Sequence, residues 1–133
     1  VRLGLTQVSH GTIPWDGGTQ RLPRLIGPGR AMEMVLTSRL LDADECVEAG
    51  LVNELVDPSR LMDRARELAS TVSSHGPIAT RYLKEALQKG ADMTLEQGLH
   101  LEADLNVILQ STADRTEGIR SFLERRKPEF KGE

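Results

Sequence analysis

Cysteine, aromatic residues and long apolar runs are all scarce in this sequence of 133 residues. The single cysteine, Cys46, cannot form an internal disulfide, which excludes a disulfide-stapled secreted domain and favours a reducing cytoplasm as the compartment. No apolar run approaches the roughly 18 residues that span a bilayer, and residues 1–10 lack the pattern of a signal peptide. We therefore expect no membrane partner.

An excess of positive charge is also missing. The sequence has 17 Lys and Arg against 20 Asp and Glu, a formal net charge of -3, so it lacks the basic footprint of nucleic-acid-binding proteins. Its three histidines, His10, His75 and His100, do not have the spacing of metal ligands. Nucleic acid, metal and a separate cofactor are not expected.

Glycine and proline concentrate in residues 11–29, which indicates a region of loop and short helix. Two short helices are predicted next, one over residues 30–37 and one after Asp42, a good N-cap residue. Gly50 suits a left-handed helix end. The short mixture of apolar and polar residues over Val52–Val56 is interpreted as a half-buried strand, the only strand signal in the chain.

Helical spacing of apolar residues dominates the rest of the chain. Four helices are predicted, starting after Pro58, at Pro77, after Thr94 and after Asp114. Thr94 with Gln97 matches a capping box, Asp114 with Glu117 is interpreted as a second cap, and Pro128 should stop the last helix. The predicted class is mostly α with a minor β element.

These helices have little in the chain to pack against, because only 3% of the residues are aromatic and only one strand is expected. Large apolar stripes are rarely left facing water, so they predict a further domain or an oligomer interface. The sequence starts at Val1 without an initiator Met and reads from there as the middle of something longer. A fragment or trimmed chain is therefore expected.

Five ordered motifs resemble the enoyl-CoA hydratase/isomerase, or crotonase, family. They are Gly11–Arg24 (GTIPWDGGTQRLPR), Arg30–Met34 (RAMEM), Ala49–Asn53 (AGLVN), Lys84–Ala86 (KEA) and Phe122–Phe130 (FLERRKPEF). The resemblance covers essentially the whole chain and implies the C-terminal part of the α/β crotonase-like fold. Residues 1–57 would be the end of the core and residues 58–133 a helical oligomerisation region, in a homo-oligomer that is a trimer or a hexamer.

The same resemblance implies an acyl-CoA substrate. Hydration of a 2-enoyl thioester needs an oxyanion hole and acidic groups that hold a water and transfer its proton. The family's Gly-rich oxyanion segment lies upstream of all the residues here. The second of its two carboxylates stands four residues before the Gly11 position, where this chain has Gln7. Glutamine holds water but transfers no proton at neutral pH, so ordinary two-carboxylate hydration is in doubt.

Asp16 and Trp15 are the other candidates in this loop. Family isomerases and some hydrolytic relatives use an Asp one position earlier, so Asp16 is either a catalytic acid/base or a cap of the following helix. Trp15 either lines the acyl pocket or is a packed aromatic. His10 is interpreted as a structural histidine rather than a catalytic one.

Phe122 and Arg125 resemble the family positions that reach the coenzyme A of the adjacent subunit, the ring near adenine and the cation near phosphate. Arginine suits phosphate through its planar fork of donors. The alternative is that Phe122 packs the last helix and that Arg125 belongs to a solvated basic end favoured by the helix dipole. Both interpretations stay open from the sequence.

Three functions remain. The first is hydration of 2-enoyl-CoA. This chain would then be one part of the enzyme and would be inactive alone. The second keeps the fold but isomerises acyl-CoA double bonds or hydrolyses CoA esters, because Gln7 breaks the acid pair while Asp16 offers a single acid. The third is a non-catalytic assembly module.

Overall fold

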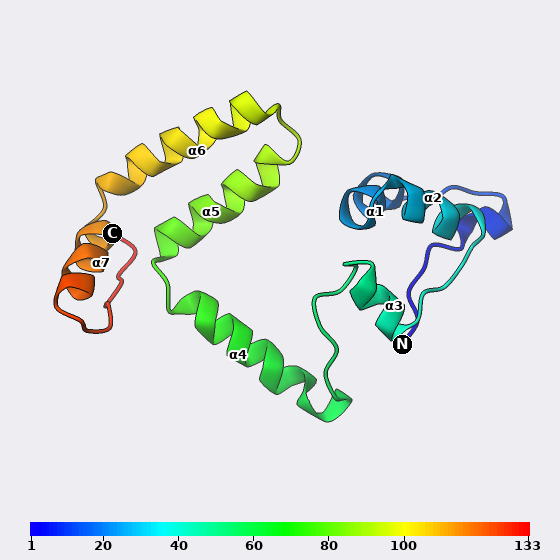
Figure 1. The fold of residues 1–133 in the computed structure, drawn as a ribbon, viewed down its shortest axis with the longest axis horizontal. Coiled ribbons are helices and arrows are strands. Elements are labelled where there is room, and N and C mark those ends of the chain that lie inside the picture. The colour runs from blue at the N-terminus through cyan, green and yellow to red at the C-terminus, as the bar shows by residue number, and fades with distance from the viewer. The chain divides into compact units, whose positions relative to one another are not determined.

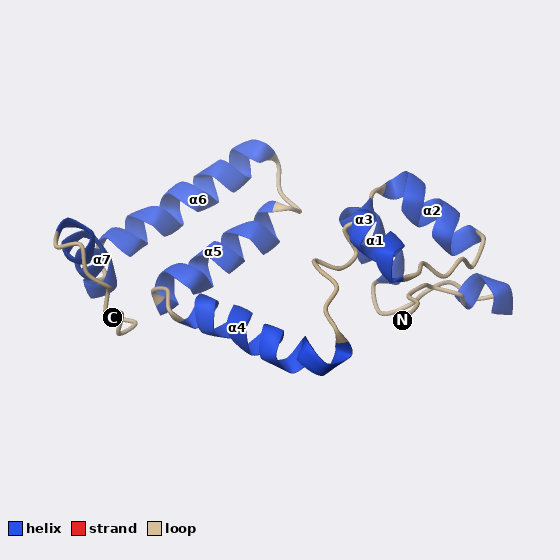
Figure 2. Cartoon of the chain, turned by 60° about the horizontal axis from the view of Figure 1, so that its bottom comes forward, coloured by secondary structure: helices blue, strands red, loops and turns tan.

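The computed structural model describes residues 1–133 and divides them into two units, Val1–Arg60 and Leu61–Glu133. Both consist of helices and connecting segments, and no strand forms (Figures 1 and 2). The mostly helical class is therefore confirmed. No helix is long and apolar enough to cross a bilayer.

The first unit contains three α-helices after the short 3-10 helix η1 (Gln7–His10). They are α1 (Gly18–Ile26), α2 (Pro28–Leu36) and α3 (Ala43–Glu48). A small apolar core joins them, made of Leu22, Ile26, Ala31, Met34, Leu41 and Cys46. Asp42 caps α3 in a capping box with Glu45, as predicted for the N-cap, and Gly50 has the expected left-handed φ of 75°.

The predicted strand over Val52–Val56 is wrong. These residues form a bend followed by a segment that belongs to no helix or strand, and Val52 packs against the apolar core. A strand needs a neighbour for its backbone hydrogen bonds, which alternation alone does not provide. The only β-type pairing is an isolated antiparallel bridge between Leu3 and Leu41, with N–O distances of 3.0 and 2.9 Å.

The second unit follows the short 3-10 helix η2 (Pro58–Arg60). Its four helices are α4 (Leu61–Ser73), α5 (Pro77–Gly90), α6 (Leu95–Gln110) and α7 (Ala113–Leu123). Helices α5 and α6 lie side by side in both ribbon views (Figures 1 and 2). Thr94 and Gln97 form the predicted capping box at the start of α6. All four predicted helices are present.

The predicted cap of α7 is wrong in its residues. Thr112 is the N-cap, and its side chain accepts a hydrogen bond from the Arg115 amide. Asp114 lies inside the first turn and is buried, where it binds the end of the chain instead. The helix ends at Leu123, five residues before Pro128, in a turn at Arg125.

Much apolar surface of the second unit faces outward, as the scarcity of aromatics predicted. Leu87, Leu95 and Phe122 are 68%, 80% and 82% exposed, and α4 has no buried residue. A groove of about 690 Å³ runs between α5 and α6 and is lined mainly by leucine and alanine side chains. Apolar surface on this scale is typical of a face that another protein surface covers.

Candidate functional site: the loop before α1 and the turn after α7

The candidate residues fall in both units, and each group is described by itself. Gln7, Trp15 and Asp16 lie in the first unit, in η1 and the loop that leads to α1. Phe122 and Arg125 lie in the second unit, at the end of α7.

Gln7 begins η1, and its backbone is fixed from the loop. The backbone N–H and the hydroxyl of Thr12 both donate to the Gln7 carbonyl oxygen at 3.2 Å. The side-chain Oε1 is buried yet accepts no hydrogen bond. Buried polar atoms nearly always have a partner, so this oxygen is an unsatisfied acceptor in the chain.

His10 is engaged locally at the other end of η1. It is exposed, and its Nδ1 lies 3.1 Å from the Ser9 hydroxyl and 3.3 Å from the Thr6 carbonyl oxygen. These contacts belong to the 3-10 turn itself. They favour the structural interpretation of this histidine over a catalytic one.

The loop before α1 is shaped by two left-handed residues in succession. Asp16 has a φ of 57° and Gly17 a φ of 82°. A Cβ on Gly18 would lie 2.8 Å from the Cβ of Pro14, so glycine is required there for close packing. The N-cap of α1 is Gly17, and no side chain caps the helix, so the interpretation of Asp16 as its cap is wrong.

Asp16 and Trp15 both face outward from this loop. The Trp15 side chain is 67% exposed and is not part of the apolar core of the first unit. Within this chain, Trp15 is therefore not a packed aromatic. A left-handed non-glycine residue is a strained feature, and such strain is frequent at functional sites. The loop therefore presents an indole and a carboxylate at its surface.

Helix α7 ends in a Schellman motif with an arginine in the usual glycine position. The Arg125 N–H donates to the Phe122 carbonyl at 3.2 Å, and the Arg126 N–H donates to the Ser121 carbonyl at 3.0 Å. Arg125 has a φ of 53°, a left-handed conformation that costs a non-glycine residue about 1–2 kcal/mol. Its guanidinium is exposed and has no hydrogen-bond or ion-pair partner.

Arg126 differs from its neighbour because its donors are occupied. Its Nη1 and Nη2 lie 2.5 and 2.9 Å from the two carboxylate oxygens of Glu117, and its Nε lies 2.6 Å from Glu124. Phe122, which is exposed, lines an apolar hollow of about 480 Å³ together with Ile78, Leu109, Ile119 and Phe130. The end of α7 therefore carries both an exposed ring, Phe122, and a guanidinium without a partner, Arg125.

Glu117 is the strongly perturbed acid of this turn. Its hydrogen bonds with the Arg126 guanidinium and then with the Glu129 amide lower the pKa of Glu117 from 4.5 to about 2. The pKa of Arg126 is raised by the same pairing. Sequence reasoning missed Glu117 as an anchor, and interpreted it only as part of a helix cap.

The Glu117 contact should therefore persist in acid. Because the folded-state pKa is below the ordinary value, the stabilisation is complete above about pH 4.5 and is lost as the pH falls through about 2. An NMR titration of the Glu117 side-chain carbonyl carbon should show a midpoint near 2. In the Arg126→Ala variant the midpoint should return toward 4.5, and equal midpoints in the two proteins would contradict this assignment.

Comparison with known proteins identifies the family. The family model described as enoyl-CoA hydratase/isomerase matches residues 1–133. The chain belongs to the enoyl-CoA hydratase/isomerase family. This confirms the resemblance that the five sequence motifs indicated.

Individual members of the enoyl-CoA hydratase/isomerase family show how much of the fold the chain covers. It is 45% identical over 130 residues to the YngF protein of Bacillus subtilis, covering 98% of this chain and 50% of that protein. It is 38% identical to crotonyl-CoA hydratase of Syntrophomonas wolfei, with the same two coverages. A solved enoyl-CoA hydratase of Bacillus anthracis matches with a TM-score of 0.97 and 45% identity, over 100% of this chain and 52% of that one.

The chain therefore spans about half the length of these enoyl-CoA hydratase/isomerase relatives. Its helical elements correspond to part of the crotonase fold, since the solved relative superimposes on all of it. The catalytic and binding roles of Gln7, Trp15, Asp16, Phe122 and Arg125 remain predictions.

Proposed function

We propose that the protein is an enoyl-CoA hydratase that adds water across the double bond of 2-enoyl-CoA thioesters. The carrying observation is the match of all 133 residues to the enoyl-CoA hydratase/isomerase family. The relative from Syntrophomonas wolfei, a crotonyl-CoA hydratase by name, supports this choice of reaction. Water oxygen would bond to the β-carbon, and a proton would be delivered to the α-carbon of the enolate that forms at the thioester.

Within this reaction Gln7 would position the water. Its buried Oε1 has no donor in the chain and would accept a hydrogen bond from a water O–H, while the amide would take no part in proton transfer. Proton transfer then depends on a carboxylate from the rest of the active site. Trp15, exposed in the loop between η1 and α1, would line the acyl pocket and narrow it.

Phe122 and Arg125 would bind the coenzyme A portion. The exposed ring offers a stacking surface for adenine, and the free guanidinium offers a bidentate donor to phosphate. Residues 1–57 would complete the acyl site, and residues 58–133 would form the contact surface of a trimer or hexamer. The outward apolar faces of α5 and α6 support that assembly role.

The product of the reaction tests the proposal directly. Incubation of the full-length natural protein with crotonyl-CoA in ¹⁸O-labelled water should give 3-hydroxybutyryl-CoA with the label on the hydroxyl oxygen, detected by mass spectrometry. Release of free coenzyme A with label in the carboxylate would identify ester hydrolysis instead. Unlabelled substrate after long incubation would argue for a non-catalytic assembly module.

Isomerisation is the second candidate, and the strained Asp16 favours it. Its exposed carboxylate sits in a left-handed loop residue, and a single acid suffices to move a proton between the α- and γ-carbons. Asp16→Asn should then lower conversion of 3-enoyl-CoA to 2-enoyl-CoA by about 100-fold or more. Asp104→Asn, an exposed site on α6, is the matched control. Unchanged activity of the Asp16 variant would remove this candidate.

A further inference from the structure

The two arginines that follow α7, Arg125 and Arg126, are not equivalent. Arg126 uses its guanidinium on Glu117 and Glu124, so it has little left for a ligand. Arg125 has a free guanidinium but a strained backbone. Arg125 thus combines a left-handed backbone with an unpaired side chain. Its neighbour Arg126 is the residue that the two carboxylates hold in place.

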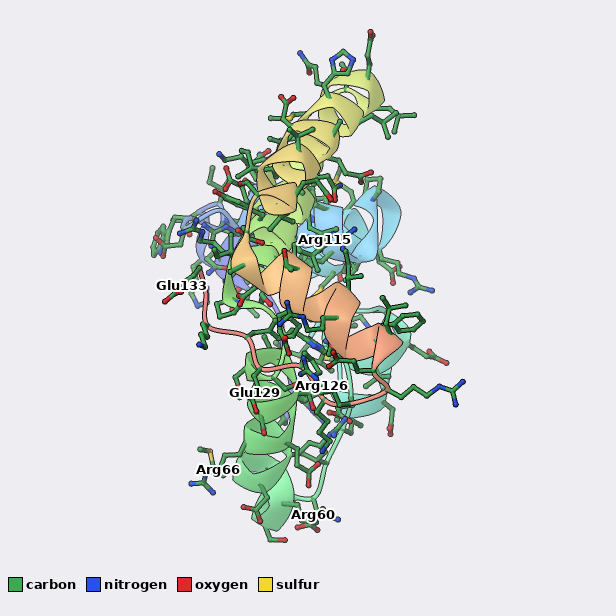
Figure 3. All side chains as sticks on the ribbon, turned by 90° about the vertical axis from the view of Figure 1, so that its left-hand side faces the viewer. Arg60, Arg66, Arg115, Arg126, Glu129 and Glu133 are labelled. Carbon is green, nitrogen blue, oxygen red and sulfur yellow. The ribbon has the colours of Figure 1, made fainter.

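Glu117 connects this turn to the end of the chain. Its Oε1 also accepts a hydrogen bond from the Glu129 N–H at 3.0 Å. One carboxylate therefore holds Arg126, the residue after the turn, and Glu129, which lies three residues further along. Figure 3 shows the chain returning alongside α7 from Arg126 past Glu129 to Glu133.

A second carboxylate continues this line of anchors. The buried Asp114 accepts from the Lys131 N–H at 2.7 Å and from the Gly132 N–H at 2.9 Å. Between the two anchors, the Phe130 ring fits beside Gly118, where a Cβ would lie 3.7 Å from its Cε1. We call residues 129–133 the C-terminal strap.

We propose that Glu117 is a positioning residue for coenzyme A binding. By gripping Arg126 and the start of the C-terminal strap, it fixes the left-handed turn at Arg125 and aims that guanidinium at a phosphate of the thioester's coenzyme A. The proposal rests on the proposed function, because it takes Arg125 to be a phosphate ligand. What is new is that the affinity for coenzyme A would depend on Glu117, whose side chain does not contact the ligand.

Calorimetric titration of the full-length natural protein with coenzyme A tests this role. Glu117→Ala should weaken coenzyme A binding by about tenfold, the effect of losing one well-placed charged hydrogen bond. Glu129→Ala is the matched control. It also removes one carboxylate, but the backbone N–H of residue 129 still donates to Glu117. That control should bind within about twofold of the parent.

A double variant separates positioning from general damage to the fold. In an Arg125→Ala background, which itself weakens binding, Glu117→Ala should cause no further loss, because both changes remove the same contact. A merely structural role would give losses that multiply. If Glu117→Ala does not fold, Arg126→Lys replaces it: this variant keeps the charge but loses the bidentate geometry, and a loss of several-fold is expected.

The outcomes are distinct for the two proposals. A parent protein that binds coenzyme A, with Glu117→Ala or Arg126→Lys binding equally well, overturns the positioning role and leaves the proposed function intact. Multiplying losses in the double variant do the same. A parent protein that binds no coenzyme A overturns both.

Discussion

Replacing Gln7 by Glu is expected to raise kcat for hydration of crotonyl-CoA by about 100-fold, the lower end of what a general acid or base contributes. The side chain keeps its size, and its buried oxygen already lacks a partner, so a carboxylate there gains the ability to exchange a proton with the bound water. Steady-state kinetics on the full-length natural protein measure the change.

Gln20→Glu is the matched control for this substitution. Gln20 is exposed on α1 and its amide only contacts the neighbouring Thr19 hydroxyl, so the same change there should leave kcat within about twofold. A fall in kcat for Gln7→Glu would show that this oxygen serves some step that requires a neutral amide. The hydration proposal would then lose its account of Gln7.

Replacing Asp114 by Ala should lower the free energy of unfolding of the second unit by about 3 kcal/mol. The buried carboxylate accepts two backbone hydrogen bonds from the C-terminal strap, and hydrogen bonds to charged groups contribute about 1.5–3 kcal/mol each. Part of this is recovered because the released amides of Lys131 and Gly132 are hydrated. Urea unfolding followed by circular dichroism measures the loss.

Asp104→Ala provides the comparison for Asp114. Asp104 is exposed in α6, where alanine is the better helix former, so that variant should match or slightly exceed the parent in stability. Equal stability of the Asp114 variant and the parent would mean that the C-terminal strap does not hold to α7 in solution. The positioning role of Glu117 would then lose its structural basis.

Local signals in the sequence predicted the helices well. The Asp42 cap and the Thr94–Gln97 box depend on residues three positions apart, so their chemistry is visible in the sequence itself. The Val52–Val56 strand failed for the opposite reason, because a strand is stabilised by a partner that the pattern does not identify. The segment does not alternate strictly, since Asn53 and Glu54 are both polar, and Val52 packs on the small core while Leu55 is exposed.

In the candidate site, too, features that depend on neighbouring residues were predicted and contacts between distant residues were missed. The ordered motifs were enough to predict the family, which the match to residues 1–133 confirms. The roles of Asp114 and Glu117 were missed because their partners lie far along the chain, 17 and 18 residues away for Asp114 and 9 for the Glu117 pair with Arg126. Contacts at such separations depend on where the chain turns. The left-handed turn at Arg125 could not be predicted, because it lacks the glycine that usually marks such a helix end.

The rate at which crotonyl-CoA loses its conjugated thioester absorbance, measured with the full-length natural protein, tests the central claim most directly. Enoyl-CoA hydration predicts a saturable loss of absorbance that stops at equilibrium and reverses when 3-hydroxybutyryl-CoA is supplied instead. Absence of any absorbance change, from a folded protein that still binds coenzyme A, would contradict hydration as the function.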